Sequence, residues 1–442
     1  MSALRAEAFP EAAVRHRASV GPAGAFPDAV DYGHSLFGAG PVEPGPDGDL
    51  IDALRLVPPV FMPRRLEKLI DLAREPVFQD VDLETWIGGF RCALPLYVSA
   101  FGSTEAASVD LGAAAGRQAG RLGIPLVIGE NVMPVNGYGR IEGPGGAAGT
   151  ERSLLTRIRA YAAGARDGYG GVVVQQSTED ADAEVWNIVY SDPNAQPLLE
   201  SGRLAFELKV GQGAKPGLGG MTLVDRAAAA RLSGAFTIDP VLGEDSDKVL
   251  RCSSPGTFTD EILRQQVRLM RNNFPRAKVW VKLTPARDVR RAALTAWAAG
   301  ADAVTVDGAE GGSGWAPVSF LQHVGLPLGE CLRRIGRVPE AASLLVSGRM
   351  WEGARVAKVL ALGAAAAGLG RAALLAVDAD PEDGLVNLVE CLAFELRMLT
   401  SAMGKYQVGE LSREDVWSPG TAEWAGEVEP AEPAVPAGVS GY

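Results

Sequence analysis

Residues 206–220 read FELKVGQGAKPGLGG, and this stretch joins a short apolar strand pattern to a glycine-rich loop. Glu207 and Lys209 lie two positions apart, so a strand places both charges on the same face. Glycines in the loop allow a sharp turn and a close approach of the backbone to a flat ligand. Lys215, beside Pro216, is then a fixed cation at a strand end. The alternative is an ordinary glycine-rich turn whose lysine is solvated.

Short apolar runs recur along the chain, most of them separated by a stretch with helical periodicity. The runs are 94–100, 124–129, 171–174, 205–210, 278–283, 303–306, 343–346 and 364–369. Helices are expected at 106–122, 154–165, 260–272, 289–299, 320–335 and 354–362. Near-continuous apolar strands that alternate with helices indicate a parallel sheet covered on its outside. Eight such units favour an α/β fold of the closed (β/α)8 TIM-barrel type, and a doubly wound open sheet is the alternative.

The barrel pattern divides the chain into three parts. Residues 1–92 form a predicted N-terminal arm and cap, because a Pro-, Gly- and Ala-rich segment leads into a helical piece and then an extended piece. Residues 93–417 contain the barrel and a C-terminal helix expected at 385–403. Residues 418–442 are rich in Pro, Ala and Glu, which is typical of a flexible tail. The functional residues are therefore expected within 93–417.

The composition is that of an ordinary globular protein and excludes several classes of partner. The 442 residues are 47% hydrophobic and 22% charged, with a net charge of −12. A negative chain without a lysine or arginine cluster argues against nucleic acid or an anionic membrane as the main partner. The first thirty residues lack a signal-peptide pattern and no apolar run reaches membrane-spanning length, so we expect a cytoplasmic protein. The 4 cysteines are far apart, which predicts reduced thiols rather than disulfides or a zinc site.

The residues that follow each apolar run are the functional candidates, because barrels of this kind carry the active site at the carboxyl ends of their strands. Polar and glycine residues gather at these positions, as a bound cofactor requires. Along the chain the candidates are Ala100, Phe101, Gly102, Glu130, Gln175, Gln176, Lys215, Lys282, Asp307, Gly308, Gly311, Gly312, Ser347, Gly348, Arg349, Gly370 and Arg371.

The loops after the seventh and eighth strands indicate a phosphorylated cofactor. Both contain glycine and lead into helices, so free backbone N–H groups and helix dipoles can hold a phosphate group. Arg349 and Arg371 lie in these loops and add positive charge. The alternative is that the glycines only make tight turns, but this is the pair of loops at which barrels bind phosphate.

Lys282 ends the VWVKL strand and is expected to point into the barrel mouth, where a buried lysine needs an anionic partner. The N1/O2 edge of a reduced flavin is one such partner, and a salt bridge to Asp307 or Glu130 is the alternative. Glu130 is also a candidate general acid or base, with a structural hydrogen-bond role as the alternative. Gln175 and Gln176 suit the amide-like edge of a flavin ring, although one of the two is expected to face a helix.

Three blocks of sequence resemble the FMN-binding glutamate synthase-like family, which includes stand-alone subunits related to N-methylglutamate synthase. The blocks are VGQGAKPGLGGM at 210–221, ADAVTVDGAEGGSG at 301–314 with FLQHVGLP at 320–327, and VSGRMWEGARVAKVLALGAAAAGLGRAALL at 346–375. The similarity extends over about residues 60–415. It implies a (β/α)8 barrel with FMN at its mouth and chemistry between amino acids and imino acids resembling 2-iminoglutarate.

The resemblance also implies roles for the candidate residues. Those implied to lie under the flavin ring or at its polar edge are Ala100, Phe101, Gly102, Gln175 and Lys282, and those implied to bind the phosphate are Gly348 and Gly370. Lys215 would meet the substrate carboxylate. Glu130 or Gln176 would handle a proton while flavin N5 exchanges hydride with the imine carbon.

Several positions depart from the family pattern. The region after the eighth strand reads AVDADPEDGLVNLVECL, in which Cys391 stands alone, so we predict that the iron–sulfur cluster of full-length glutamate synthase is absent. We also expect no glutaminase domain, so ammonia would be free or come from a partner. Arg349 and Trp351 stand where the family has a glycine and an arginine, and Met221 stands where glutamate synthase has a polar residue.

The sequence therefore predicts an FMN-dependent oxidoreductase that acts on an amino or imino acid and forms an oligomer, with a glutaminase-like or electron-transfer subunit as a possible partner. One alternative keeps the flavin for hydroxy-acid oxidation or for an isomerisation, which a histidine base near the flavin would favour. The other alternative is a non-catalytic subunit of a larger synthase complex.

Overall fold

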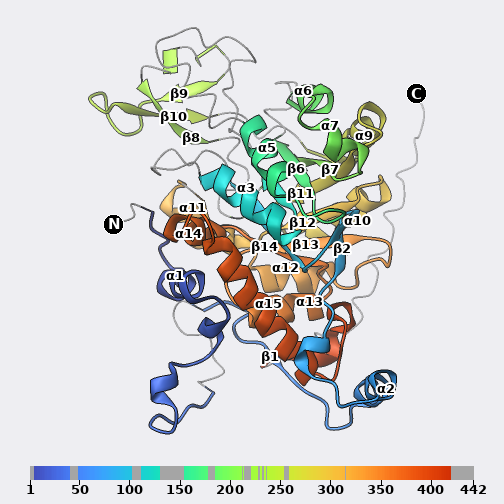
Figure 1. Ribbon diagram of the computed structural model, residues 1–442. Helices are drawn as coiled ribbons and strands as arrows, with labels where there is room; N and C mark the ends of the chain where they lie inside the picture. Colours follow the sequence, from blue (N-terminus) through green and yellow to red (C-terminus); the bar gives the residue numbers. More distant parts are fainter. Residues whose placement is uncertain are drawn as a thin grey trace, which may run out of the picture.

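The structure is a computed structural model that describes residues 4–39, 48–101, 111–129, 154–177, 185–211, 213, 221–226, 229–230, 233–234, 236–252, 258–313, 315–419. Its centre is a closed barrel of parallel strands with helices around it (Figure 1). Going round the barrel, the strands are β11 (Lys278–Leu283), β12 (Ala303–Val306), β13 (Ser343–Ser347), β14 (Ala366–Leu369), β4 (Leu96–Phe101), β5 (Leu126–Ile128), β6 (Val172–Ser177) and β7 (Leu204–Lys209). All eight predicted strands are present, and the (β/α)8 prediction is confirmed.

Most of the helices that cover the barrel lie in predicted intervals, but those at 185–191, 196–200 and 371–379 lie outside them, and one predicted interval is wrong. The helices are α3 (Leu111–Leu122), α5 (Leu154–Gly164), α6 (Val185–Ser191), α7 (Gln196–Glu200), α9 (Asp260–Asn273), α10 (Val289–Ala298), α11 (Val318–His323), α12 (Leu328–Ile335), α13 (Gly353–Ala361), α14 (Arg371–Ala379) and α15 (Gly384–Ala402). The single helix expected at 320–335 is wrong, because the chain breaks there into α11 and α12. Gly325 has φ +103° and Pro327 precedes α12, and neither residue continues a helix.

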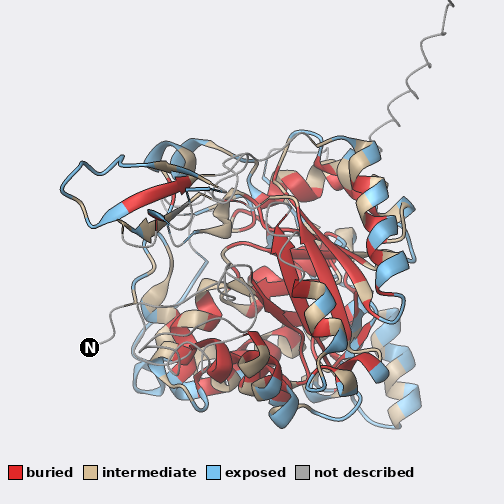
Figure 2. Cartoon of the chain, turned by 90° about the horizontal axis from the view of Figure 1, so that it is seen from above, coloured by how far each residue is buried: buried red, intermediate tan, exposed pale blue. Residues whose placement is uncertain are grey.

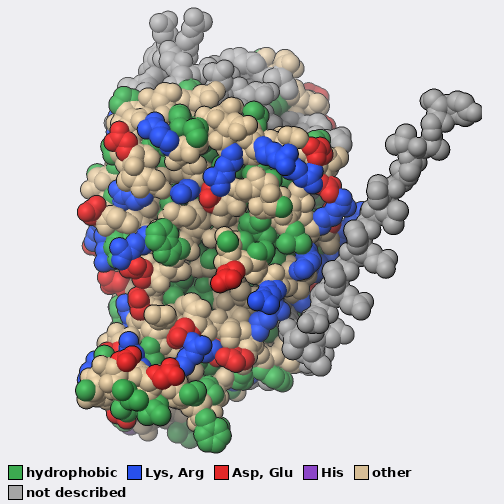
Figure 3. All heavy atoms as spheres, turned by 90° about the vertical axis from the view of Figure 1, so that its right-hand side faces the viewer, with side chains coloured by type: hydrophobic (Ala, Val, Ile, Leu, Met, Phe, Trp, Pro, Cys, Tyr) green, Lys and Arg blue, Asp and Glu red, His purple; other side chains and the backbone are tan. Residues whose placement is uncertain are grey.

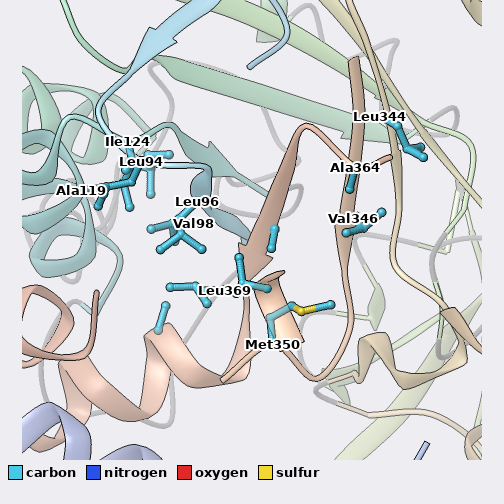
Figure 4. Packing of buried hydrophobic residues seen from close by; sticks show 14 of the residues in the cluster. Leu94, Leu96, Val98, Ala119, Ile124, Leu344, Val346, Met350, Ala364 and Leu369 are labelled. Carbon is cyan, nitrogen blue, oxygen red and sulfur yellow. The ribbon is translucent and has the colours of Figure 1, made fainter. Parts of the chain in front are cut away.

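Apolar side chains lie on both sides of the barrel wall. Those that point outward form the main core with the helices, and Figure 4 shows the part of it around Leu96, Val98 and Leu369. The inward-pointing ones form a second set, here called the floor cluster: Ile87, Phe90, Cys92, Tyr97, Val127, Val173, Ala205, Trp280, Ala303, Leu345 and Ala366. The strands therefore run through the interior as buried elements, with exposed residues on the outer faces of the helices (Figure 2). This two-sided burial explains the near-continuous apolar runs in the sequence.

A hairpin closes the barrel at the end where the strands begin. It consists of β2 (Thr85–Ile87) and β3 (Phe90–Cys92), joined by Gly88 and Gly89. The indole of Trp280 donates its Nε1 hydrogen to the carbonyl of Gly88 at 2.9 Å. A Cβ at Gly88 would lie 2.4 Å from that indole nitrogen, so the tryptophan fits only against glycine. The floor of the barrel is thus sealed by side chains, and any ligand site lies at the opposite mouth.

The N-terminal segment packs on the helical layer. Helix α1 (Glu11–Val20) lies against α14 and α15. Arg17 pairs with Glu395 at 2.7 Å, and Arg15 pairs with Asp378 at 2.9 Å. Helix α2 (Pro63–Leu72) and the two-stranded pair of β1 (Arg55–Leu56) with β15 (Val416–Trp417) lie at the lower end of the molecule in Figure 1. The division at residues 92 and 417 remains a prediction, since these contacts join the arm to the barrel helices.

A small antiparallel sheet that the sequence did not predict follows β7. Its strands are β8 (Thr222–Asp225), β9 (Thr237–Asp239) and β10 (Lys248–Cys252), with β10 in the middle. Figure 1 places it above the barrel, on the side where the strands end.

The surface agrees with the mixed charge of the composition. On the face in Figure 3, basic and acidic side chains are interspersed. Within the described part of the chain, no helix has the length and apolar character needed to cross a bilayer.

Candidate functional site

A cavity lies at the mouth of the barrel, among the residues that follow the strands. The described residues enclose about 80 Å³ there, which suits one end of a ligand better than a whole flavin. Its lining consists of Phe9, Ser99, Ala100, Lys282, Asp307, Gly311, Gly312, Ser347, Gly348, Arg349, Met350, Gly370 and Arg371. The structure thus brings ten of the predicted candidates to one place: Ala100, Lys282, Asp307, Gly311, Gly312, Ser347, Gly348, Arg349, Gly370 and Arg371.

Two glycines let the backbone come close on one side of this cavity. Gly348 has φ +119°, and a Cβ there would lie 2.5 Å from the carbonyl oxygen of Asp307. A Cβ at Gly312 would lie 3.1 Å from Nε of Arg371. Gly370 immediately precedes α14, so the first backbone N–H groups of that helix lie beside the cavity. This is the geometry of an anion site at a helix start.

Positive charge accumulates at the same end. Burial, together with the neighbouring Arg349, lowers the pKa of Arg371 to about 10. Arg371 donates hydrogen bonds to the carbonyl oxygens of Glu310 at 2.8 Å and of Glu7 at 3.3 Å, and no carboxylate of the described residues pairs with it. The lowered pKa means that the surrounding protein does not fully offset the free-energy cost of burying the charged guanidinium of Arg371. An anion bound here would reduce that cost.

Arg349 reaches the cavity through an unusual backbone. Its φ is +58°, a left-handed conformation that glycine adopts at little cost and a residue with a Cβ adopts rarely. Its guanidinium donates from Nη1 to Asp52 at 2.9 Å. Its buried Nε has no hydrogen-bond partner among the described residues. The side chain is therefore held from the outside by the N-terminal segment while it still lines the cavity.

Lys282 and Asp307 form a buried ion pair at the cavity, with 3.1 Å between Nζ and Oδ2. Less than a tenth of either side chain is exposed. This is the salt bridge that the sequence left open as the alternative for Lys282. The other carboxylate oxygen of Asp307, Oδ1, is buried without a hydrogen-bond partner among the residues described. The pair therefore offers both a cation and an acceptor to a ligand.

A second polar group lies inside the barrel between these residues and the floor cluster. The Glu207 carboxyl group accepts hydrogen bonds from Gln175 Nε2 at 2.5 Å and from Thr305 Oγ1 at 2.8 Å. Glu207 is 1% exposed, and burial raises its pKa although Lys282 opposes the shift. Glu207 was not among the predicted site residues. The sequence did contain a signal for Glu207: it is a charged residue within an apolar strand, two positions before Lys209 and on the same face of that strand.

Some predicted residues lie away from the cavity. Gln176 follows the inward-facing Gln175 in β6, so its side chain points to the other face of the strand. Its amide donates to the Gln175 carbonyl oxygen at 2.8 Å. Both observations argue against a catalytic role for Gln176. Phe101 packs against the outer core and does not line the cavity. The cause is a register shift between Val98 and Phe101, which turns Ala100 toward the cavity instead. Gly308 does not line the cavity, and its φ of +58° serves the turn after β12.

Three predicted residues, Gly102, Glu130 and Lys215, lie outside the described residues. Cys92, Cys331 and Cys391 are buried and Cys252 is partly buried, all as free thiols. Among the described residues, no cluster of His, Cys, Asp or Glu side chains could hold a metal ion. The expected absence of an iron–sulfur cluster stays a prediction.

Comparison with solved structures agrees with the fold. An active chimera of (S)-mandelate dehydrogenase superposes with a TM-score of 0.53 at 18% identity, covering 93% of this chain and 99% of that one. The flavin-binding domain of flavocytochrome b2 from baker's yeast superposes with a TM-score of 0.51 at 17% identity, covering 83% of this chain and 76% of that one. At these identities the likeness shows the barrel fold alone.

Comparison with sequences finds relatives named for glutamate synthase. Residues 168–384 match a family model described as a conserved region in glutamate synthase. An archaeal glutamate synthase [NADPH] from Methanocaldococcus jannaschii is 31% identical over 180 residues, which is 39% of this chain and 34% of that protein. A glutamate synthase large subunit-like protein from Rhizobium meliloti is 36% identical over 185 residues, or 40% of each chain. The matched part thus spans between a third and two fifths of these relatives. Over residues 168–384 the chain is glutamate synthase-like, which confirms the resemblance predicted from the glycine- and lysine-bearing loop.

Proposed function

We propose that the chain is an FMN-dependent oxidoreductase that acts on an amino or imino acid. The observation that carries this proposal is the convergence of Lys282, Arg349 and Arg371 on one cavity at the barrel mouth. Three cations around a glycine-lined pocket at a helix start match a ligand that has a phosphate at one end and an electron-rich ring edge at the other. The relatives named glutamate synthase support the class of chemistry.

The residues of the cavity suit the phosphate group and the polar ring edge of FMN in chemical type. Gly348, Gly370 and the first N–H groups of α14 would hold the phosphate, with Arg371 as counter-charge. Lys282 would face the polar edge of the ring, where Asp307 keeps the ammonium group charged and oriented. FMN, when bound, supplies hydride exchange at its N5 atom. The role of the protein is then to orient the ring and to exclude water from it.

Substrate handling is assigned to residues that the sequence alone predicted. Lys215 would hold the substrate carboxylate, and Glu130 would transfer a proton. Gln176, the other proton-handling candidate, is disfavoured by its position in β6. A glutaminase-like or electron-transfer partner and an oligomeric state belong to the same proposal, since the relatives are longer than the matched part.

The first test is the visible spectrum of the purified protein, followed by titration with FMN. We expect flavin absorbance, and an affinity for FMN that falls at least about tenfold in Arg371→Met, because a buried charge-assisted contact is lost. Arg291→Met, at an exposed arginine of α10 outside the cavity, is the control and should bind like the unchanged protein. A colourless protein that ignores added FMN would reject the proposal and favour a non-catalytic subunit.

A second test separates the chemistry. With FMN bound and oxygen excluded, L-glutamate is expected to bleach the flavin, whereas L-lactate and mandelate are not. The described histidines, His16, His34 and His323, do not line the cavity, so the base that would favour hydroxy-acid oxidation is missing from its lining. Bleaching by a hydroxy acid but not by glutamate would instead favour the hydroxy-acid alternative.

A further inference from the structure

The N-terminal segment forms part of the cavity, although it lies far outside the matched region. Phe9 is a lining residue, and the guanidinium of Arg371 lies over its ring at 4.5 Å from the centroid. Arg371 also donates from Nη1 to the carbonyl oxygen of Glu7 at 3.3 Å. The same arginine that lines the phosphate end of the cavity thus fastens residues 7–9 across it.

Further contacts fix this segment in place. Arg15 on α1 bonds to the Glu11 carboxylate at 3.0 Å and to the carbonyl oxygen of Leu4 at 3.2 Å. It also pairs with Asp378, which lies near the end of α14. Residues 4–11 are therefore anchored to the helix whose first residue is Arg371.

The backbone just before Phe9 supports a functional placement. Ala8 has φ +51°, a left-handed conformation that costs a residue with a Cβ free energy. Arg349 is another of the few non-glycine residues in the described chain with positive φ, and it lines the same cavity. Strained backbone of this kind persists where the surrounding structure holds it, and it tends to cluster at ligand sites.

We propose that Phe9 is a specificity-determining residue: with Arg371 it closes the phosphate end of the cofactor site, so that the site accepts a flavin ending in a monophosphate and rejects a dinucleotide. The inference rests on the proposed function, because it concerns the same cofactor. Physically, a ring stacked on the phosphate-binding arginine occupies the space through which a second phosphate and its adenosine would leave the site. The segment would also slow the release of FMN.

The test compares FMN, FAD and riboflavin on the full chain, by quenching of flavin fluorescence. The unchanged protein is expected to bind FMN at least about 100-fold more tightly than FAD. Phe9→Ala should reduce this ratio at least about tenfold and speed FMN release by a similar factor, because the stacked ring is gone. Phe26→Ala, which removes an N-terminal aromatic that packs on Phe394 away from the cavity, is the matched control and should leave both quantities unchanged.

Two further measurements keep the outcome clear. Phe9→Leu retains apolar bulk and should keep most of the FMN preference, and circular dichroism of each variant checks the fold. Trypsin cleavage after Arg5 should slow when FMN is added, which reports closure without any turnover. An unaltered FMN-to-FAD ratio in folded Phe9→Ala overturns the inference while the proposed function stands. Failure of the unchanged protein to bind FMN rejects the proposed function itself.

Discussion

Two layers of the barrel interior differ sharply although the same strands build both. The floor cluster is almost wholly apolar. Further along the same strands lies a polar layer, defined here as Gln175, Glu207, Lys282 and Thr305, each two residues beyond a floor residue, together with Asp307 just after β12. Apolar burial is worth about 25 cal/mol per Å², whereas a buried charge costs several kcal/mol unless it is paired. The floor cluster therefore stabilises the fold, whereas the polar layer costs stability, and the proposed function assigns it to ligand binding.

The largest expected effect is in the floor cluster. Trp280→Ala should lower the free energy of unfolding by about 3–5 kcal/mol, because it removes a fully buried ring and leaves a cavity. Chemical denaturation measures this loss. Trp86→Ala, at a tryptophan that is 64% exposed, is the control and should cost about 0.5 kcal/mol. Similar losses of unfolding free energy for the two variants would mean that Trp280 does not stabilise the floor cluster more than an exposed tryptophan does.

A break in the polar layer should affect both stability and binding. Lys282→Met leaves Asp307 as a buried charge without its partner and should cost about 3 kcal/mol of unfolding free energy, together with FMN affinity. The double variant Lys282→Met with Asp307→Leu should recover most of the stability by removing the stranded charge, but not the affinity. Recovery of FMN binding in the double variant would show that the ion pair is structural only.

A smaller effect is expected at Thr305. Thr305→Val keeps the shape of the side chain and removes the hydroxyl group that donates to Glu207. The expected loss is about 1–2 kcal/mol in the free energy of unfolding, since one buried acceptor loses a partner. Thr295→Val on helix α10 is a matched change outside the barrel interior. Equal losses for the two variants would argue against a coupled network around Glu207.

The smallest effect on stability is expected for Glu207→Gln. This variant is recognised by a change in how the free energy of unfolding depends on pH. The folded state keeps a proton on Glu207 above the pH at which the unfolded chain releases it, so this group's contribution to stability falls as pH rises above the unfolded pKa. The amide variant lacks that penalty. Its stability relative to the unchanged protein should therefore be greater at pH 8 than at pH 5.

The groups that set this shift surround Glu207 from several strands. Lys282 of β11 favours the charged form of Glu207, whereas Asp307, just after β12, opposes it. On the other side, Tyr97 of β4 has its own pKa raised by burial and by Glu207. Denaturation at the two pH values measures the difference, and a constant difference would show that Glu207 is ionised in the folded protein.

The fold was predictable because each barrel strand is buried on both faces, which leaves a continuous apolar run such as 278–283. The antiparallel sheet after β7 was not, since its short strands include exposed polar residues such as Asp225 and Asp239. The rim glycines and the cations Lys282 and Arg371 were also predictable from their place after a strand. The outward turn of Phe101 depends on a local register shift that carries no sequence signal. Phe9 was missed because its contact spans the whole barrel domain and arises only on folding.

The docking of residues 4–11 beside the cavity has a practical consequence for anyone who purifies this protein. A fusion partner joined ahead of residue 4 would be covalently linked within a few residues of Phe9. Such a tag would weaken the contact of this segment with Arg371, and under the proposed function it would speed the loss of FMN during chromatography. Preparations with an N-terminal tag and with a C-terminal tag should therefore be compared for colour before any preparation is judged inactive.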